Sequence, residues 1–166
     1  MTKQTSNSRI TFTRLPAIPI EQVTALLNEP RNSRHMPLAT TFTPEQAADW
    51  VRDKDAQWAI HGFGPWAILV NGEFAGWGGF EAEAGSADFA LVLLPGHWGM
   101  GEMITRKALE TGFVEFDVHT VTIALPYSRQ PTKVVGRLGF NADGEVIYGG
   151  ERFRRYKLNR QDWRTA

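Results

Sequence analysis

A strand, a glycine-rich loop, a long helix and a second strand follow one another in the middle of this 166-residue chain. Residues Asp88–Leu94 form a nearly continuous apolar run that predicts a strand buried on both faces, and Pro95-Gly96 ends it. Residues Gly101–Phe116 have the apolar spacing of a helix, and the β-branched segment Thr120–Leu125 predicts another strand. A strand, a helix and a second strand in this order predict a parallel crossover within one sheet, and such crossovers are right-handed.

Segments on both sides of this unit predict further strands and helices of one α+β domain. Asn71-Gly72 between two apolar runs is the strongest short-range signal for a β-hairpin. Thr43 and Gln46 form a capping-box pattern with Pro44 at the first helical position, which predicts a helix start. The remaining predicted elements are a strand over Arg9–Leu15, a helix over Ile20–Leu27 ended by Pro30, an irregular loop over Arg31–Pro37, strands over Trp66–Val70 and Glu73–Phe80, a helix over Pro131–Leu138 stopped by Gly139, and a hairpin of Glu145–Tyr148 with Arg152–Leu158.

Charge and cysteine content exclude several classes of protein and site. Eighteen Lys and Arg residues balance eighteen Asp and Glu residues, so a basic nucleic-acid-binding or polybasic membrane-binding protein is disfavoured. The chain has no cysteine, which excludes disulfides, thiolate metal sites and a catalytic thiol. Its four histidines show no metal-ligand spacing, and no apolar run approaches the length of a membrane span. Residues 1–8 are polar and lack the apolar centre of a signal peptide, so we expect a cytoplasmic protein without a metal.

The loop Pro95-Gly-His-Trp-Gly-Met-Gly101 stands between a predicted strand and a predicted helix. Glycines allow the backbone N–H groups of such a loop to turn toward one point, and the helix N-terminus adds about half a positive charge, so the loop favours a phosphate group. Taken alone, the loop fits a tight strand-to-helix turn equally well. It lacks the Gly-Lys-Ser/Thr of a Walker loop, and it does not match the dinucleotide-binding fingerprint, which needs a further glycine and an opening βαβ unit.

The glycine loop and four other segments resemble the GNAT superfamily of N-acetyltransferases. Its members carry a Gln/Arg-x-x-Gly-x-Gly/Ala loop that holds the pyrophosphate of acetyl-CoA, and Leu93–Glu102 is similar to that loop. Ser128–Phe140 matches the spacing of the family's Asn-x-x-Ser segment and of the Lys-Leu-Gly-Phe that ends the following helix. The ribosomal-protein-alanine acetyltransferase branch is similar in three more segments, so that the resemblance covers about residues 9 to 163: Asn28-Glu-Pro30, Phe42–Gln46 and Tyr156–Trp163.

The resemblance implies a GNAT-like α+β fold. This fold is a mixed, mostly antiparallel twisted sheet of about seven strands with a central parallel βαβ crossover, flanked by about four helices. We expect one N-acetyltransferase domain over residues 9–166, after a disordered tail over residues 1–8. The implied reaction is the direct attack of an amine on the thioester of acetyl-CoA. The implied partners are acetyl-CoA and an amine acceptor, and we expect no nucleic acid and no membrane as partner. The protein could be a monomer or a homodimer.

The cofactor-binding residues that the resemblance implies lie in a strand, in the glycine loop and after the crossover. The strand pairs through its backbone with the pantetheine arm, at a bulge whose N–H groups stabilise the oxyanion. The sequence departs from the family pattern at Gly96 and at Met100, and Glu102 adds a negative charge near the expected phosphates, which Lys133 or Arg129 could offset. The implied set is Leu91, Val92, Leu93, Trp98, Gly99, Met100, Gly101, Glu102, Met103, Ser128 and Lys133.

Two carboxylates and one phenol are the catalytic candidates. Asp88 begins the buried strand and Glu81 ends the preceding one, so either is a candidate for the base that takes the amine's proton, with water as the alternative. Tyr127 follows the strand after the crossover, and its hydroxyl can protonate the departing thiolate because a phenol has a pKa of about 10. Pro131 occupies the position of the family's Ser, so the role of that hydroxyl does not transfer. Each candidate also fits a purely structural position, as a solvated strand-end carboxylate or a surface aromatic.

Arg34, His35, Trp50 and Trp77 are candidates for the acceptor side, because the family places its substrate between the first two helices and the sheet. The acceptor stays open, since a protein N-terminus and a small-molecule amine would use the same catalytic parts. Two other classes of function compete with an enzyme. A non-catalytic acyl-CoA sensor would keep the loop and lose the acid and the base, whereas an interaction domain would not bind CoA.

Overall fold

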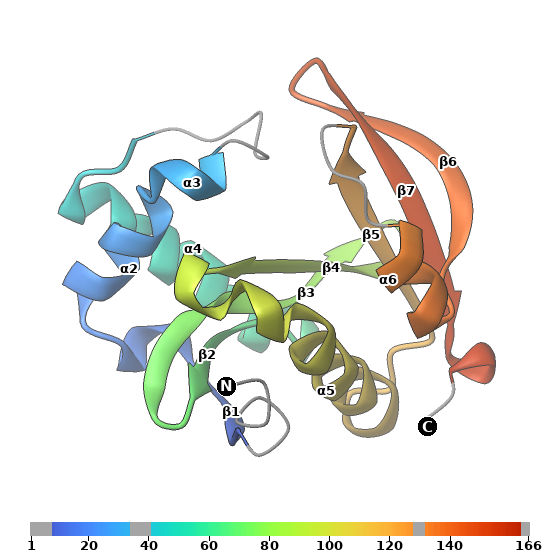
Figure 1. Ribbon diagram of the computed structural model, residues 1–166, viewed down its shortest axis with the longest axis horizontal. Coiled ribbons are helices and arrows are strands. Elements are labelled where there is room, and N and C mark those ends of the chain that lie inside the picture. Colours follow the sequence, from blue (N-terminus) through green and yellow to red (C-terminus); the bar gives the residue numbers. More distant parts are fainter. Residues whose placement is uncertain (1–7, 34–40, 128–131, 164–166) are drawn as a thin grey trace.

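Residues 8–33, 41–127 and 132–163 are described by the computed structural model of the protein, and they form a seven-stranded sheet with helices on both faces (Figure 1). The strands are ordered β1-β2-β3-β4-β5-β7-β6 across the sheet. β4 and β5 are parallel, and the other neighbouring pairs are antiparallel, so the predicted α+β fold with a central parallel crossover is confirmed. The strands are β1 (Ile10–Thr13), β2 (Pro65–Val70), β3 (Glu73–Glu83), β4 (Ser86–Leu93), β5 (Thr120–Pro126), β6 (Asn141–Tyr148) and β7 (Glu151–Asn159).

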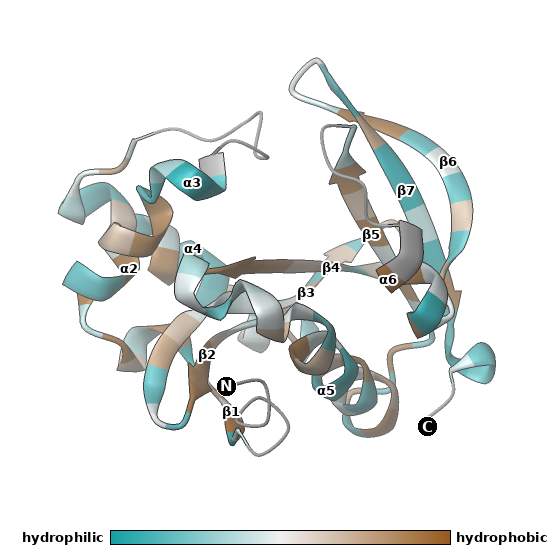
Figure 2. Cartoon of the chain, viewed as in Figure 1, coloured by the Kyte–Doolittle hydropathy of each residue, from teal (hydrophilic) through white to brown (hydrophobic). Residues whose placement is uncertain are grey.

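The helices divide between the two faces of the sheet. The α-helices are α2 (Ile20–Leu27), α3 (Pro30–Ser33), α4 (Pro44–His61), α5 (Gly101–Glu115) and α6 (Thr132–Leu138), and the 3-10 turns are η1 (Leu15–Ala17), η2 (Pro95–Met100) and η3 (Arg160–Asp162). α2 and α4 pack on the face that carries Trp77 and Val92, which we call the α4 face. α5 and α6 pack on the face that carries Phe80 and Phe89, which we call the α5 face. Most of β4 is hydrophobic in Figure 2, in keeping with its place between these layers.

Local turn and cap signals fix several element boundaries as predicted. Thr43 Oγ1 accepts a hydrogen bond of 3.1 Å from the Gln46 N–H, and the Thr43 N–H donates to Gln46 Oε1 at 2.8 Å, so the capping box at the start of α4 is confirmed. Asn71 and Gly72 have φ values of 52° and 85°, which a two-residue hairpin turn between β2 and β3 requires. Gly139 follows α6 with φ 96°, as a C-terminal stop does.

Several sequence-based expectations differ from the structure, and among them β3 continues to Glu83 and β6 begins at Asn141. The first strand is shorter than Arg9–Leu15, because Leu15 opens the turn η1 with Pro16 in its first positions. Part of the expected irregular loop is helical, because Pro30 suits the first turn of a helix and α3 begins there. The strand after Ser86 is not buried on both faces: Val92 is partly exposed, since β5 does not accompany β4 along its whole length.

The pairing between β4 and β5 is short. Their parallel register contains two residue pairs, the second of which joins Asp88 to Thr122. Beyond that pair, β4 stays with β3 and β5 stays with β7. We use the word splay for the parts of β4 and β5 that do not pair with each other, Phe89–Leu93 and Ile123–Pro126. The Asp88–Thr122 pair, where the two strands still meet, is its vertex. The splay divides the sheet into two halves that remain joined at the vertex.

Candidate active site

Among the described residues, one edge of β4 has no strand paired with it along the splay, and we call it the free edge of β4. The Leu94 N–H donates to the Ala75 carbonyl of β3 at 2.8 Å. Because the backbone groups of an antiparallel strand alternate between its two sides, those of Phe89, Leu91 and Leu93 face the splay. The expected bulge in this strand is wrong, since the register with β3 runs along β4 without a shift. The splay therefore presents a regular row of N–H and C=O groups.

Two side chains cap the far end of this edge. Asn32 of α3 donates Nδ2–H to the Leu93 carbonyl at 3.1 Å, and Trp98 Nε1–H donates to the same oxygen at 3.0 Å. Trp98 Nε1 also lies 3.2 Å from Asn32 Oδ1, and Asn32 is buried. The Leu93 carbonyl is thus engaged, and the Phe89 N–H faces Thr122 in the parallel pairing, whereas no such contact is found for Leu91 among the described residues. Sequence reasoning missed Asn32, because its partners lie 61 and 66 residues away.

The α4 face carries two carboxylates at the vertex. Glu81 and Asp88 are directly opposite each other in the β3–β4 register, so their side chains share one face. Thr122 Oγ1–H donates to Asp88 Oδ1 at 2.9 Å. Lys54 Nζ and Gln57 Nε2 of α4 donate to Glu81 Oε2 at 2.6 Å and 2.8 Å. The structure brings the two candidate bases together and surrounds them with side chains from other elements that no local pattern indicated.

Asp88 is the carboxylate whose protonation the fold changes most. Burial raises the pKa of Asp88 to about 7. The hydrogen bond from Thr122 and the charge of Arg155 oppose this increase, while the negative charges of Glu83 and Glu81 add to it. A general base works best when its pKa lies near the working pH, so Asp88 has the proton affinity that the prediction requires. Glu81, in contrast, is ion-paired with Lys54 at 2.6 Å.

Aromatic side chains extend the α4 face away from the carboxylates. Trp77 of β3 meets Trp50 of α4 edge-on, with ring centroids 5.1 Å apart. Lys54 Nζ lies 5.1 Å from the Trp77 centroid and 5.7 Å from the Trp50 centroid. Both predicted acceptor-side tryptophans therefore lie beside the cation that holds Glu81. Arg34 and His35, the other two acceptor-side candidates, lie outside the described residues.

On the other side of the sheet, the glycine loop runs directly into α5. η2 ends at Met100, the N-cap residue of the 15-residue helix α5, and the Met100 side chain makes no capping hydrogen bond. Neither Gly99 nor Gly101 has a positive φ, and a Cβ added at either would meet no atom within 4 Å. Neither backbone conformation nor packing among the described residues requires these glycines. They leave open space at a helix N-terminus, where a phosphate group is favoured.

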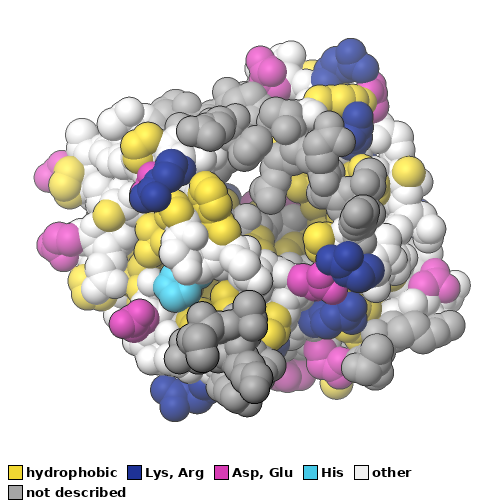
Figure 3. Space-filling view, viewed as in Figure 1, with side chains coloured by type: hydrophobic (Ala, Val, Ile, Leu, Met, Phe, Trp, Pro, Cys, Tyr) yellow, Lys and Arg dark blue, Asp and Glu magenta, His cyan; other side chains and the backbone are white. Residues whose placement is uncertain are grey.

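Two arginines offset the negative charge of Glu102. Its carboxylate pairs with Arg137 of α6 at 2.6 Å and with Arg106 at 3.4 Å. The hydrogen bond from Arg137 is the main cause that lowers the pKa of Glu102. Basic and acidic side chains lie next to one another over α5 and α6 in Figure 3. Sequence reasoning missed Arg137 and named Lys133 and Arg129; Arg129 and the side chain of Lys133 lie outside the description.

The other predicted cofactor-binding residues differ in whether their side chains or backbone groups are accessible to a cofactor. The Met100 side chain is buried in a cluster with Ile104, and Met103 packs against the same cluster. The Trp98 indole is half exposed beside the loop. The Val92 backbone faces β3 by the alternation of the ladder. Ser128, like Pro131, lies outside the described residues.

Tyr127 lies beyond the end of β5 and far from the vertex. Roughly five residue steps separate it from Thr122, which is about 16 Å along a strand. The guanidinium groups of Arg154 and Arg152 lie 4.6 Å and 5.2 Å from its ring centroid, and Tyr127 is 37% exposed. The structure therefore does not bring Tyr127 together with Asp88.

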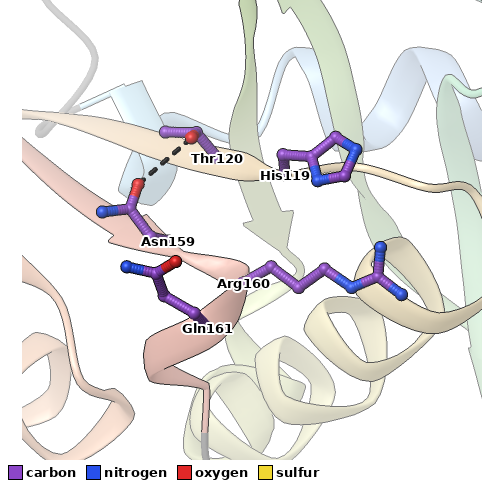
Figure 4. A pocket seen from close by; sticks show the side chains of 5 residues that line it. All are labelled: His119, Thr120, Asn159, Arg160 and Gln161. Atoms are coloured by element: carbon purple, nitrogen blue, oxygen red, sulfur yellow. Dashed lines mark hydrogen bonds between the residues drawn. The ribbon is translucent and has the colours of Figure 1, made fainter.

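A polar pocket lies at the opposite end of β5 from the splay. Thr120 Oγ1–H donates to Asn159 Oδ1 at 3.1 Å within it, as Figure 4 shows. Its lining residues are His119, Thr120, Asn159, Arg160 and Gln161, none of which is a catalytic candidate. In the described parts of the chain, no cluster of His, Cys, Asp or Glu could hold a metal ion. None of the helices described here is long and apolar enough to cross a membrane.

The comparisons with known proteins identify the family. The sequence model of the acetyltransferase (GNAT) domain matches residues 9–141, which is most of the chain. The chain belongs to the GNAT acetyltransferase family. A comparison with curated proteins finds no match.

Solved structures share the fold of this GNAT domain at low sequence identity. A GNAT-family acetyltransferase from Bacillus anthracis has a TM-score of 0.73 and 15% identity, over 93% of this chain and 95% of that chain. The spermidine N-acetyltransferase from Vibrio cholerae, in complex with CoA and spermine, has a TM-score of 0.74 and 13% identity, over 95% and 98%. An aminoglycoside acetyltransferase in complex with coenzyme A has a TM-score of 0.74 and 14% identity, over 93% and 96%. The predicted GNAT-like fold is confirmed.

Proposed function

We propose that this GNAT protein is an acetyl-CoA-dependent N-acetyltransferase in which a primary amine attacks the acetyl thioester directly. The observation that carries the proposal is the vertex of the splay, where Asp88 adjoins the free edge of β4. A free strand edge can bind an extended arm by main-chain hydrogen bonds. A carboxylate with a pKa of about 7 at the end of that edge can take a proton from the attacking amine.

The cofactor is held, in this proposal, by backbone groups on the α5 side. The Leu91 backbone and the Phe89 carbonyl pair with the pantetheine arm, and the open space at Gly99 and Gly101 admits the pyrophosphate to the N-terminus of α5. The residues present fit such a group, because a Cβ at either glycine would occupy that space. Arg137 supplies positive charge and keeps Glu102 from repelling the phosphates.

In the proposed acetyl transfer, Asp88 is the base that takes the amine's proton. The neutral amine nitrogen forms a bond to the thioester carbon, and its proton passes to Asp88 directly or through one water. Backbone N–H groups along the splay edge stabilise the oxyanion before the carbon–sulfur bond breaks. The thiolate then leaves and takes a proton, for which Tyr127 is the proposed donor and water the alternative. Glu81 is the second candidate base, although Lys54 already binds its carboxylate.

The acceptor is an amine that approaches from the α4 face. Glu81 and Asp88 give this face acidic groups, and Trp77 and Trp50 give it aromatic surface. Two proteins of similar structure are named as acetyltransferases of amines, namely of spermidine and of aminoglycosides. We propose a protein N-terminus or a small-molecule amine as the acceptor class of this chain.

Mass-shift screening tests the proposal. The purified protein is incubated with acetyl-CoA and a panel of polyamines, aminoglycosides, amino acids and short peptides. We expect at least one amine to gain the mass of one acetyl group while free CoA appears in equal amount. Acetyl-CoA binding by calorimetry, with no transfer to any amine, would instead indicate a non-catalytic acyl-CoA sensor. Absence of acetyl-CoA binding would contradict the cofactor assignment as well.

A further inference from the structure

The β6–β7 hairpin brings a tyrosine to the carboxylates near the vertex. Tyr148 Oη–H of β6 donates to Glu83 Oε1 at 2.6 Å, although 65 residues separate the two in the chain. The Tyr148 ring packs on Phe153 of β7, with centroids 5.5 Å apart. Burial, followed by the contact with Glu83, raises the pKa of the Tyr148 hydroxyl well above its ordinary value. The hydroxyl is therefore protonated at neutral pH and acts as a donor.

Glu83 is a diagonal neighbour of Asp88 on the same face of the β3–β4 hairpin. Glu81 lies opposite Asp88, and Glu83 lies opposite Ser86, two residues nearer the turn. Diagonal neighbours on one face are within reach of long side chains. Glu83 is the last residue of β3, so rotation about its side-chain bonds could also carry the carboxylate into solvent. The bond from Tyr148 selects one of these arrangements.

We propose that Tyr148 is a positioning residue whose hydrogen bond holds the Glu83 carboxylate beside Asp88 and so fixes a negative charge next to the group that takes the amine's proton. The inference rests on the proposed function only for the role of Asp88 as base. The placement of Glu83 by Tyr148 is a property of the ligand-free protein and can be tested without substrate. In this proposal Tyr148 acts through Glu83, to which its hydroxyl donates.

The charged groups around Asp88 fix the direction of each expected effect. From β3, Glu83 and Glu81 raise the pKa of Asp88, and from β7 Arg155 lowers it. From α4, Lys54 pairs with Glu81. From β6, Asp143 pairs with Arg155 at 3.2 Å. Loss of the Glu83 charge must therefore lower the pKa of Asp88, and loss of the Arg155 charge must raise it.

Carbon-13 NMR of the side-chain carboxyl groups measures this directly in the ligand-free protein, with Asp88→Asn assigning the signal. Glu83→Gln should lower the Asp88 titration midpoint by about one pH unit. Tyr148→Phe removes only the hydroxyl, lets Glu83 turn into solvent, and should lower the midpoint by roughly half a unit. Tyr156→Phe is the matched control, because Tyr156 is buried in the cluster on the α5 face. It should leave the midpoint unchanged.

A double variant separates positioning from a general effect of the hydroxyl. In Glu83→Gln/Tyr148→Phe the midpoint should equal that of Glu83→Gln alone, because Tyr148 has no charge left to place. A Tyr148→Phe midpoint equal to that of the parent would overturn the proposal. So would a double variant shifted further than Glu83→Gln, or a Glu83→Gln variant that titrates like the parent.

The pH dependence of kcat/KM distinguishes failure of this inference from failure of the proposed function. If Asp88 is the base, the acid limb of the profile should move with the NMR midpoint in each variant. An NMR midpoint that falls in Tyr148→Phe while the rate profile stays in place would support the positioning of Glu83 and contradict the role of Asp88.

Discussion

The two faces of the splay are built in different ways. On the α5 face the candidate cofactor surface is mostly backbone, namely the free edge of β4 and the open space beside Gly99 and Gly101. On the α4 face the candidate chemistry depends on side chains that come from helix α4 and from strands β3, β4, β5, β6 and β7. In the proposed reaction, one face binds acetyl-CoA through main-chain groups, and the other takes up the amine's proton through a side-chain carboxylate.

Substitutions on the two faces should therefore act on different steps. Backbone recognition is sensitive to anything that blocks approach, and insensitive to the identity of the neighbouring side chains. A side-chain network is sensitive to the loss of a single proton or charge. Changes on the α4 face should therefore alter the rate and spare acetyl-CoA affinity, while changes on the α5 face should do the reverse.

The largest effect is expected from Asp88→Asn. The amide keeps the shape of the carboxyl group and cannot take the amine's proton, so kcat should fall roughly a hundredfold or more. Steady-state kinetics with an identified amine measures this, and calorimetry should show acetyl-CoA affinity close to that of the parent. Glu81→Gln is the paired control for the neighbouring carboxylate. Full rates in both variants from about pH 6 to about pH 9 would exclude a side-chain base, and water would take its place.

The same substitution should change stability in a pH-dependent way. The pKa of Asp88 is raised from 3.8 to about 7 in the folded protein, so the folded state holds this proton more tightly than the unfolded state. The contribution of Asp88 to stability is therefore present below about pH 4 and is lost as pH rises to about 7. Asp88→Asn should be more stable than the parent by on the order of 1–3 kcal/mol at about pH 8, with no such gain at about pH 4. Urea unfolding at both values checks this, and an equal difference at both would contradict it.

Gly101→Val should act on affinity alone. Gly101 has helical φ and ψ of −57° and −45°, and a Cβ there meets no atom within 4 Å, so the fold should tolerate the change. The added methyl groups would occupy the space proposed for the pyrophosphate, and the Kd for acetyl-CoA should rise about tenfold or more. Gly136→Val in α6, with equally open space, is the matched control. Unchanged affinity in a folded Gly101→Val protein would refute the loop assignment.

Tyr127→Phe should have the smallest effect. A thiol has a pKa of about 8.5, so a departing thiolate gains little from an acid at neutral pH. We expect kcat to fall about fivefold with acetyl-CoA affinity unchanged, if the hydroxyl donates that proton. Single-turnover kinetics shows whether chemistry limits the rate. A variant with the parent's chemical rate would make Tyr127 a packing partner of Arg152 and Arg154.

The contrast between the faces also explains which features could be predicted from the sequence. Asn71-Gly72, the capping box at Thr43 and the strand–helix–strand unit were predicted because neighbours in the chain determine them. The position of the glycine loop between a strand and a helix was predicted for the same reason. Asp88 and Glu81 were named individually from their strand-end positions, and the register then placed them opposite each other.

The hydrogen-bond partners of Asp88 and of its neighbour Glu83 could not be predicted. Tyr148 reaches Glu83 and Thr122 reaches Asp88 across 65 and 34 residues, with no local spacing to signal either contact. The buried Asn32 was missed for the same reason. The expected bulge in β4 came from the family resemblance, and the regular β3–β4 register corrected it.

The pH dependence of single-turnover acetylation tests whether Asp88 at the vertex removes the amine's proton. Parent and Asp88→Asn proteins, each saturated with acetyl-CoA, are mixed with an identified amine, and acetyl transfer is followed by mass spectrometry. Once each rate is divided by the fraction of neutral amine at that pH, the parent rate should rise with pH and level off above a midpoint near the Asp88 pKa of about 7. The variant should lack this transition and be slower throughout. The same transition in both proteins, at similar rates, would contradict the claim.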